Sequence, residues 1–270
     1  MKSLLIPAED TDQFETTLTT ASAFASRFQS RADAVALRFA QFQAVGAEPI
    51  VAVAFPPTSD TDPETARRAR QRFDTFVRSR SLADTFGWRA GEPMDDAGLG
   101  ALARVYDLTV IARPGAGPDA TRMTTFEAAL FDSGRPILIA PPRPVLSLGE
   151  HVVVSWNQST EAAHTVASAL PILDAATTVT ILTVNTAVVA GPDASDLRGY
   201  LSMHDIEASV VSETDTGRGP GNTILDATKK LGGDLLVKSA YTHSRLRQMI
   251  FGGATSQILS SAEIPVFMAN

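Results

Sequence analysis

The stretch 236–255, LVKSAYTHSRLRQMIFGGAT, carries the residue types of an anion site. An apolar strand that includes Lys238 leads into a polar loop with Arg245 and Arg247, and the glycine pair 252–253 precedes an expected helix. Glycine lets backbone amides approach phosphate oxygens closely, and the first amides of a helix favour an anion. This order of residues predicts a cradle for the phosphate of a nucleotide.

Two side chains, Ser239 and Thr242, stand where such a loop most needs glycine. Their β-carbons crowd the backbone amides, and β-branched threonine resists positive φ. Hydroxyl groups and the nearby cations can still donate hydrogen bonds to a phosphate, whereas basic loop residues commonly face solvent. The stretch is therefore either a weakened anion site or a loop that keeps only the shape of one.

Other catalytic patterns are weak. The serines lack a nucleophile elbow, and the absence of cysteine excludes disulfides and thiolate chemistry. Acidic pairs such as 95–96 fall in polar stretches, where carboxylates usually cap helices or are solvated. The four histidines are scattered without the spacing of metal ligands: His151, His164, His204 and His243. We therefore predict no catalytic residue and no metal site.

A second glycine-rich stretch, GRGPGN at 217–222, has the wrong spacing for a dinucleotide loop and contains Pro220. It predicts a turn before a helix over 222–231, with Asn222 as the cap.

Composition narrows the class of protein. The 270 residues are 44% hydrophobic and 20% charged, a normal globular balance. A net charge of −7 disfavours nucleic acid, and the basic run 66–80 has the apolar stripe of a solvated helix. No apolar run reaches the roughly 18 residues of a membrane helix, and the N-terminus becomes acidic too early for a secretory signal. We expect a soluble cytoplasmic protein that contacts neither nucleic acid nor membrane.

The elements that would position these residues occur twice. SLLIPAEDTDQFETTLTTASAFA at 3–25 and HVVVSWNQSTEAAHTVASALPIL at 151–173 each join an apolar strand, a polar turn and an amphipathic helix. Near the ends of the copies, DLTVIARPG parallels DLLVKSAYT, and RPILIAPP parallels IPVFMAN. Two copies of one fold explain these matches.

Within each copy, short apolar strands alternate with helices. This alternation predicts an α/β fold of two tandem, doubly wound parallel-sheet domains, whose ligands bind beyond the carboxyl ends of the strands. We place the domains at 1–142 and 151–270, with a linker over 143–150.

The first copy is less suited to phosphate. Its matching loop, ARPGAGPDATRMTTF, contains Pro114 and Pro118, which lack the amide donors of a cradle. We interpret this copy as a structural partner in which Pro7, Ala8 and Glu9 line a vestigial cleft.

The last strand of each copy is apolar and should lie at a sheet edge, where it invites pairing. We predict that residues 136–140 and 265–269 pair antiparallel inside one chain and form a pseudo-dimer.

The chain resembles the universal stress protein family in its tandem two-domain form. The resemblance rests on DLLVKSAYTHSRLRQMIFGGATSQILSSAEIPVFM in the second copy, and on LLIPAED, DLTVIARP and FEAALFDSGRPILIAPP in the first. It implies a Rossmann-like fold of the adenine-nucleotide-hydrolase type.

Nucleotide-binding members carry G-x-x-G, nine residues, then G-[S/T]. Those positions fall here on Ser239, Thr242, Gly252 and Gly253, so three of the four depart from the pattern, and Thr255 follows.

By the same resemblance, Asn157 would meet the ribose and Val184 the base of ATP or another adenine nucleotide. Trp156, beside Asn157, either stacks on a base or plugs the cleft; the altered glycine loop favours the plug.

The resemblance implies a non-enzymatic cytoplasmic stress-response or regulatory protein that binds an adenine nucleotide or another anion weakly in its C-terminal domain. Two alternatives remain open: a slow ATPase or other nucleotide-handling enzyme on the same fold, and a ligand-free interaction module. An unknown protein partner and a homo-oligomer are both compatible with the sequence.

Overall fold

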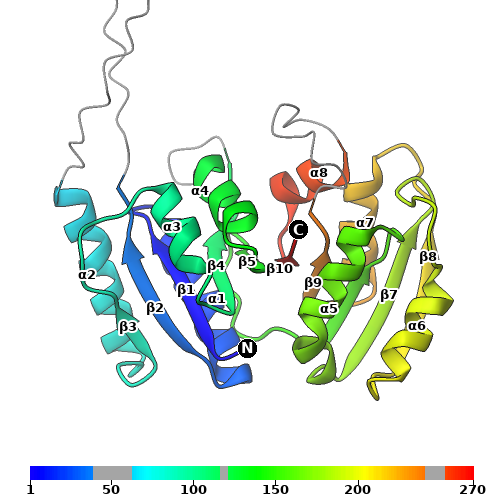
Figure 1. Ribbon diagram of the computed structural model, residues 1–270, viewed down its shortest axis with the longest axis horizontal. Coiled ribbons are helices and arrows are strands. Elements are labelled where there is room, and N and C mark those ends of the chain that lie inside the picture. Colours follow the sequence, from blue (N-terminus) through cyan, green and yellow to red (C-terminus); the bar gives the residue numbers. More distant parts are fainter. Residues whose placement is uncertain (39–62, 116–120, 241–252) are drawn as a thin grey trace, which may run out of the picture.

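The structure is a computed structural model that describes residues 1–38, 63–115, 121–240 and 253–270 (Figure 1). The described residues form a single sheet in the order β3-β2-β1-β4-β5-β10-β9-β6-β7-β8. Its strands are β1 (Ser3–Ala8), β2 (Arg31–Ala36), β3 (Phe86–Trp88), β4 (Leu108–Ala112), β5 (Ile137–Ala140), β6 (His151–Ser155), β7 (Thr178–Val184), β8 (Ala208–Glu213), β9 (Leu235–Lys238) and β10 (Val266–Met268).

Helices cover both faces of the sheet. One apolar core lies between the sheet and α1, α2, α5 and α6, and a second lies between the opposite face and α3, α4, η1, α7 and α8. The bounds are α1 (Gln13–Phe28), α2 (Pro63–Ser79), α3 (Asp96–Ala103), α4 (Met123–Glu127), the π-helical turn η1 (Ala128–Asp132), α5 (Thr160–Asp174), α6 (Ala194–Ser202), α7 (Pro220–Lys230) and α8 (Ala254–Ser261).

The two halves of the chain repeat one topology. The strand order β3-β2-β1-β4-β5 recurs as β8-β7-β6-β9-β10, and neighbouring strands within each half are parallel. Strands β4 and β9 are buried along their whole length, as expected when helices cover both faces of a parallel sheet. The predicted fold of two tandem doubly wound domains is confirmed.

The helix that follows the first strand of each half buries the face that its spacing predicts. The stripe of α1 (Phe14, Leu18, Ala21, Ala25) and the stripe of α5 (Ala162, Val166, Ala169, Leu173) are all buried. On α2, by contrast, the arginine side chains remain exposed while Phe73 and Phe76 are buried, which confirms a solvated helix face.

An aspartate plays the same part in each half. The carboxylate of Asp107 accepts hydrogen bonds from the backbone N–H groups of Lys2 (2.6 Å) and Ser3 (3.1 Å). The carboxylate of Asp234 accepts from the N–H groups of Gly149 (3.0 Å) and His151 (3.1 Å). Each aspartate thus fixes the start of the first strand of its own half by hydrogen bonds. This role explains why DLTVIARPG and DLLVKSAYT both begin with aspartate.

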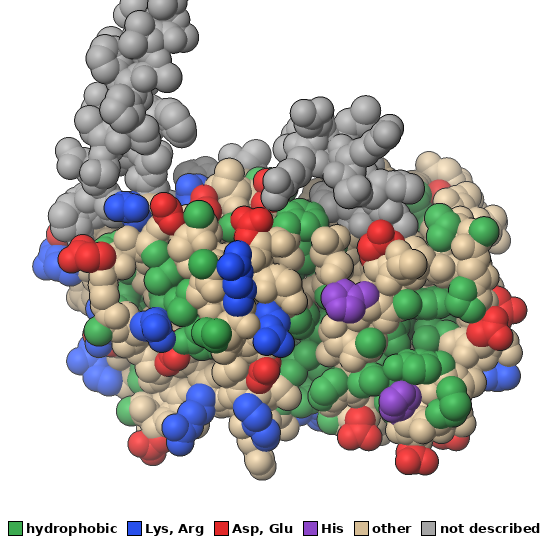
Figure 2. Space-filling model, in the orientation of Figure 1, with side chains coloured by type: hydrophobic (Ala, Val, Ile, Leu, Met, Phe, Trp, Pro, Cys, Tyr) green, Lys and Arg blue, Asp and Glu red, His purple; other side chains and the backbone are tan. Residues whose placement is uncertain are grey.

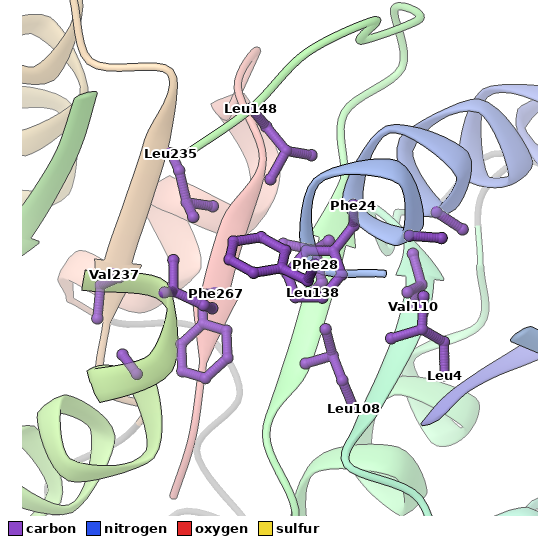
Figure 3. Packing of buried hydrophobic residues seen from close by; sticks show 14 of the residues in the cluster. Leu4, Phe24, Phe28, Leu108, Val110, Leu138, Leu148, Leu235, Val237 and Phe267 are labelled. Carbon is purple, nitrogen blue, oxygen red and sulfur yellow. The ribbon is translucent and has the colours of Figure 1, made fainter. Parts of the chain in front are cut away.

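The halves join through their last strands. Strands β5 and β10 pair antiparallel, with Phe267 opposite Leu138, as the sequence predicted. Phe267 also pairs with Val237 of β9, and Figure 3 shows it lying between these two side chains. Arg113 of the first half donates to the carbonyl of Ala262 (2.9 Å) across the same joint. The pseudo-dimer is therefore one continuous sheet inside one chain.

The predicted start of the helix at 222–231 is wrong. Helix α7 begins at Pro220, its cap is Gly219, and the Asn222 amide donates instead to the carbonyl of Arg218 (2.9 Å). Proline suits the first helical position because its missing N–H would have no partner there, and Gly219 takes φ +89°, which disfavours other residues.

The first turn of α7 packs closely on α8, and Gly221 makes this approach possible. A β-carbon at Gly221 would stand 2.4 Å from the carbonyl oxygen of Ala254. We expect Gly221→Ala to lower the free energy of unfolding by about 1–3 kcal/mol in urea titration. Gly199→Ala in α6 is the matched control, since no described atom lies within 4 Å of its added β-carbon. It should be neutral or raise stability by up to about 1 kcal/mol. Equal effects of the two changes would contradict the packing argument.

Candidate functional site

In Figure 1 the carboxyl ends of β2, β4 and β9 point toward the same side of the molecule, at the top of the view. In the second half, β6 and β9 are neighbours there, with Ser155 opposite Lys238. Asn157 and Ser239 follow these strand ends, and all four side chains are buried. Two parallel strands thus bring a compact set of buried polar groups to the edge where doubly wound sheets bind ligands.

Lys238 is the charged member of this set. Only 4% of its surface is exposed, and its Nζ donates to the carbonyl oxygen (2.8 Å) and to the Oγ (3.2 Å) of Ser239. Burial disfavours the ammonium form and lowers the pKa of Lys238 to about 8, while the negative charge of Glu161 in the first turn of α5 acts in the opposite direction.

Asn157 orders the start of α5. Its Oδ1 accepts hydrogen bonds from the N–H (3.3 Å) and the Oγ (2.8 Å) of Ser159, and the Ser159 Oγ caps the helix by accepting from the N–H of Ala162 (3.1 Å). The backbone carbonyl of Asn157 accepts from the N–H of Val189 (3.0 Å). The Asn157 side chain, which was predicted to contact a ribose, thus makes its hydrogen bonds within the turn between β6 and α5.

The residues expected beside a base are enclosed. Val184 is 2% exposed and belongs to the core against α7 and α8. Trp156 is also buried, and its Nε1 donates to the carbonyl of Pro192 (3.0 Å). The indole lines an apolar groove of about 360 Å³ between α5 and α6, beside Val166 and Tyr200. Figure 2 shows hydrophobic side chains gathered over α5 and α6 of the second half. The first half, on the left of the same view, presents more charged side chains. This placement favours the plug over a stacking platform.

Helix α8 begins at Ala254, directly after Gly253. Gly253 is exposed with φ +96°, and Thr255 is buried in the first turn of the helix. Thr242 and Gly252, the two other predicted loop positions, lie outside the described residues. The structure therefore brings Asn157 and Ser239 to neighbouring strand ends and places Thr255 at the start of α8, while the loop itself stays a prediction.

The first half contains a polar cluster that the sequence analysis missed in large part. Glu9, at the end of β1, is 5% exposed and accepts a hydrogen bond from the Thr121 Oγ1 (2.6 Å). Arg122 donates to Asp96 (2.8 Å), which also accepts from the Thr125 Oγ1 (2.8 Å). Burial is the main cause that raises the pKa of Glu9. The sequence pointed to Glu9 alone, because its partners come from segments more than 80 residues away.

The raised pKa of Glu9 has a consequence for stability. Because folded Glu9 binds its proton more tightly than unfolded Glu9, its contribution is present below about pH 4.5 and is lost as pH rises through the folded pKa. We expect Glu9→Gln to remove this decline in the free energy of unfolding, measured in urea between pH 4 and 7. The exposed Glu207→Gln variant should keep it, and loss of the decline in both variants would assign it to another group.

Two kinds of feature are absent from the described residues. No group of three or more His, Cys, Asp or Glu side chains in that part of the chain could hold a metal ion. No described helix is long and apolar enough to cross a membrane.

Comparison with known proteins decides the family of the second half. The family model described as "Universal stress protein family" matches residues 150–270. Residues 150–270 belong to the universal stress protein family. The expectation drawn from the DLLVKSAYT block is thus confirmed for this part of the chain.

Solved structures extend the universal stress protein fold to the whole chain. A universal stress protein from Archaeoglobus fulgidus aligns with a TM-score of 0.73 at 16% identity, over 99% of this chain and 96% of its own. A functionally unknown protein from Pseudomonas aeruginosa aligns with a TM-score of 0.58 at 13% identity, over 100% of this chain and 92% of its own. None of the curated proteins compared with the chain matches it. At these identities the structures show a shared fold, which both halves of the chain adopt.

Proposed function

We propose that this is a non-enzymatic, cytoplasmic stress-response or regulatory protein whose second half binds a small anionic ligand, with ATP or another adenine nucleotide as the first candidate. The observation that carries the proposal is the buried polar set at the ends of β6 and β9: Ser155, Asn157, Lys238 and Ser239. Buried polar side chains at this edge of a doubly wound sheet are the usual basis of a ligand site.

The equivalent sheet edge of the first half differs from that of the second, and this difference supports a site in the second half alone. At the equivalent edge, the Glu9 carboxylate is enclosed by Thr121 and Thr125. Arg122 also lies 4.0 Å from Glu9, so the polar contacts of this side chain are made within the first half. We therefore assign one anion site to the chain, in the universal stress protein domain of residues 150–270.

One pair of side chains gives the enzymatic alternative some basis. The Lys238 Nζ lies 3.2 Å from the Ser239 Oγ, a spacing at which a neutral amine could accept the hydroxyl proton. Against it, the same Nζ also donates to the Ser239 carbonyl, and an amine that donates both hydrogen bonds is not acting as a base. We interpret the pair as a positioned cation, and place a slow ATPase second.

A single preparation of the full chain tests the proposal. The protein is purified and denatured, and any released small molecules are identified; native protein is then titrated with ATP by calorimetry, and phosphate release is followed. We expect nucleotide binding in the micromolar to millimolar range without turnover. Turnover that is lost in Ser239→Ala would establish the enzyme instead, and neither binding nor turnover would leave the interaction module.

A further inference from the structure

Equivalent helices of the two halves line a groove of the same size. The groove between α1 and α2 of the first half and the groove between α5 and α6 of the second each have a volume of about 360 Å³. Glu15 and Leu18 of α1 line the first groove, and Ala163 and Val166, at the matching positions of α5, line the second. The groove is therefore a repeated feature of the fold.

The groove of the first half is polar. Arg68, Gln71 and Arg72 of α2 line it, and both arginines lie close to the carboxylate of Asp10, at 2.5 Å for Arg68 and 3.2 Å for Arg72. The arginine charges of this groove are thus compensated within the same half.

The groove of the second half is apolar apart from one carboxylate. Trp156 and Val166 are buried, Tyr200 is half-buried, and Figure 2 shows further hydrophobic side chains over the same two helices. Asp196 is the only charged side chain among the described residues that line the groove. Its Oδ2 accepts a hydrogen bond from the backbone N–H of Asp193 (3.0 Å). No lysine, arginine or histidine of the described ranges forms an ion pair with it.

Two matching positions account for much of the difference between the grooves. Ala8 of the first half corresponds to Trp156, and Glu15 corresponds to Ala163. The second half therefore has an aromatic ring where the first has a methyl group, and a methyl group where the first has a charge.

The groove is separate from the polar groups at the ends of β6 and β9. Trp156 belongs to the core under α5 and α6, whereas Val184 and Ala240 belong to the core on the opposite face of the sheet, under α7 and α8. A ligand in the groove is consequently independent of the proposed anion site.

We propose that the groove between α5 and α6 binds a small organic cation, a protonated amine whose apolar body packs against Trp156, Val166 and Tyr200 and whose ammonium group faces Asp196. The volume and the apolar lining with one polar group are typical of small-molecule sites. Tryptophan and tyrosine rings attract cations, and the carboxylate supplies the complementary charge. The same carboxylate disfavours an anionic ligand.

The tryptophan content of the chain makes the site observable. The sequence contains two tryptophans, so Trp156 is the remaining one in a Trp88→Phe background. Trp88 lies in the first half, where its ring contacts the ring of Phe73 edge-on (5.4 Å between centroids), and phenylalanine retains an aromatic ring for this contact. Fluorescence of the full-length variant then reports on the groove.

The test compares two probes of the same shape, phenethylammonium and the uncharged phenethyl alcohol, at pH 7 and constant ionic strength. We expect a saturable change in Trp156 fluorescence, with phenethylammonium bound at least about fivefold more tightly than phenethyl alcohol. Equal affinities overturn the inference. No saturable change with phenethylammonium also overturns it and leaves the groove to an apolar segment of a partner protein.

Two variants in the same background test the charge. Asp196→Asn removes the carboxylate but keeps an oxygen that can accept the hydrogen bond from Asp193. It should reduce the preference for phenethylammonium by at least about threefold. Asp174→Asn, at the exposed end of α5, is the control and should keep the preference. A loss in both variants, or in neither, contradicts the role of Asp196.

A second pair of variants tests the location. Ala163→Leu adds a larger side chain at an exposed position that lines the groove, and Ala167→Leu makes the same change at an exposed position one turn further along α5 that does not line it. Exposed positions tolerate such changes, so both proteins should fold. We expect Ala163→Leu to weaken binding of both probes at least about fivefold and Ala167→Leu to leave it unchanged. Equal binding in the two variants would place the probes elsewhere and overturn the inference.

Discussion

Replacing Phe267 by alanine is expected to lower the free energy of unfolding by about 3–5 kcal/mol, the usual effect of truncating a fully buried phenylalanine. Phe267 is 0% exposed and lies in the middle of the row Leu138, Phe267 and Val237, which crosses from β5 through β10 to β9. The cavity would therefore open at the joint between the two halves of the chain.

The same core extends through both halves, so the loss should not be confined to one of them. Figure 3 shows Phe28 and Leu138 of the first half in the cluster that also contains Leu235 and Phe267 of the second. We expect urea unfolding of Phe267→Ala, followed by fluorescence and by circular dichroism, to give coincident transitions at lower urea than wild type. Met203→Ala, at a side chain 78% exposed, is the control and should stay within about 0.5 kcal/mol.

A deletion of residues 264–270 tests the joint more severely. It removes β10 and leaves the apolar edges of β5 and β9 unpaired, and such edges favour aggregation. We expect loss of soluble, monodisperse protein in size-exclusion chromatography. A deletion product as soluble and stable as wild type would mean that the antiparallel pairing does not hold the halves together.

Replacing Lys238 by methionine is expected to raise the free energy of unfolding of the ligand-free protein by about 1–3 kcal/mol at pH 7. The buried ammonium has its pKa lowered from 10.5 to about 8, and each pKa unit corresponds to about 1.4 kcal/mol in favour of the unfolded state at low pH. Methionine fills similar space without a charge, and the hydrogen bond lost at the Ser239 carbonyl offsets part of the gain.

The sign of the pH dependence follows from the lowered pKa. Between about pH 8 and 10.5 the unfolded chain binds the Lys238 proton and the folded chain does not, so wild-type stability rises with pH in this window. The advantage of Lys238→Met should therefore be largest at pH 7 and should shrink toward pH 10. Urea unfolding at pH 7, 8.5 and 10 measures it.

The matched control for this prediction is Lys229→Met, at an exposed lysine. It should change stability by less than about 0.5 kcal/mol at each pH. A loss of stability in Lys238→Met at pH 7 would instead show that the lysine is kept as a structural donor to Ser239. A functional residue that lowers stability when its ligand is absent is the expected signature of a binding site.

Much of the fold could be predicted from the sequence because it depends on short-range periodicity. The spacing of Phe14, Leu18, Ala21 and Ala25 determines which face of α1 is buried wherever that helix packs. The pairing of β5 with β10 was also predictable, since two apolar strands that end their copies of one fold each need a neighbour. The start of α7 was missed because Asn222 is a good cap residue, but Pro220 and Gly219 suit the backbone better.

The candidate site was likewise predictable only in part from the sequence. The sequence by itself determined the duplicated α/β core, the family resemblance of 150–270, and the replacement of glycine by Ser239 and Thr242, because these follow from residue type and order. Only the tertiary structure decided that Glu9 is enclosed by Thr121 and Thr125, and that Lys238 is buried rather than solvated. Burial of a charge depends on which strands and helices close around it, and β6, β9 and α5 come from distant parts of the chain.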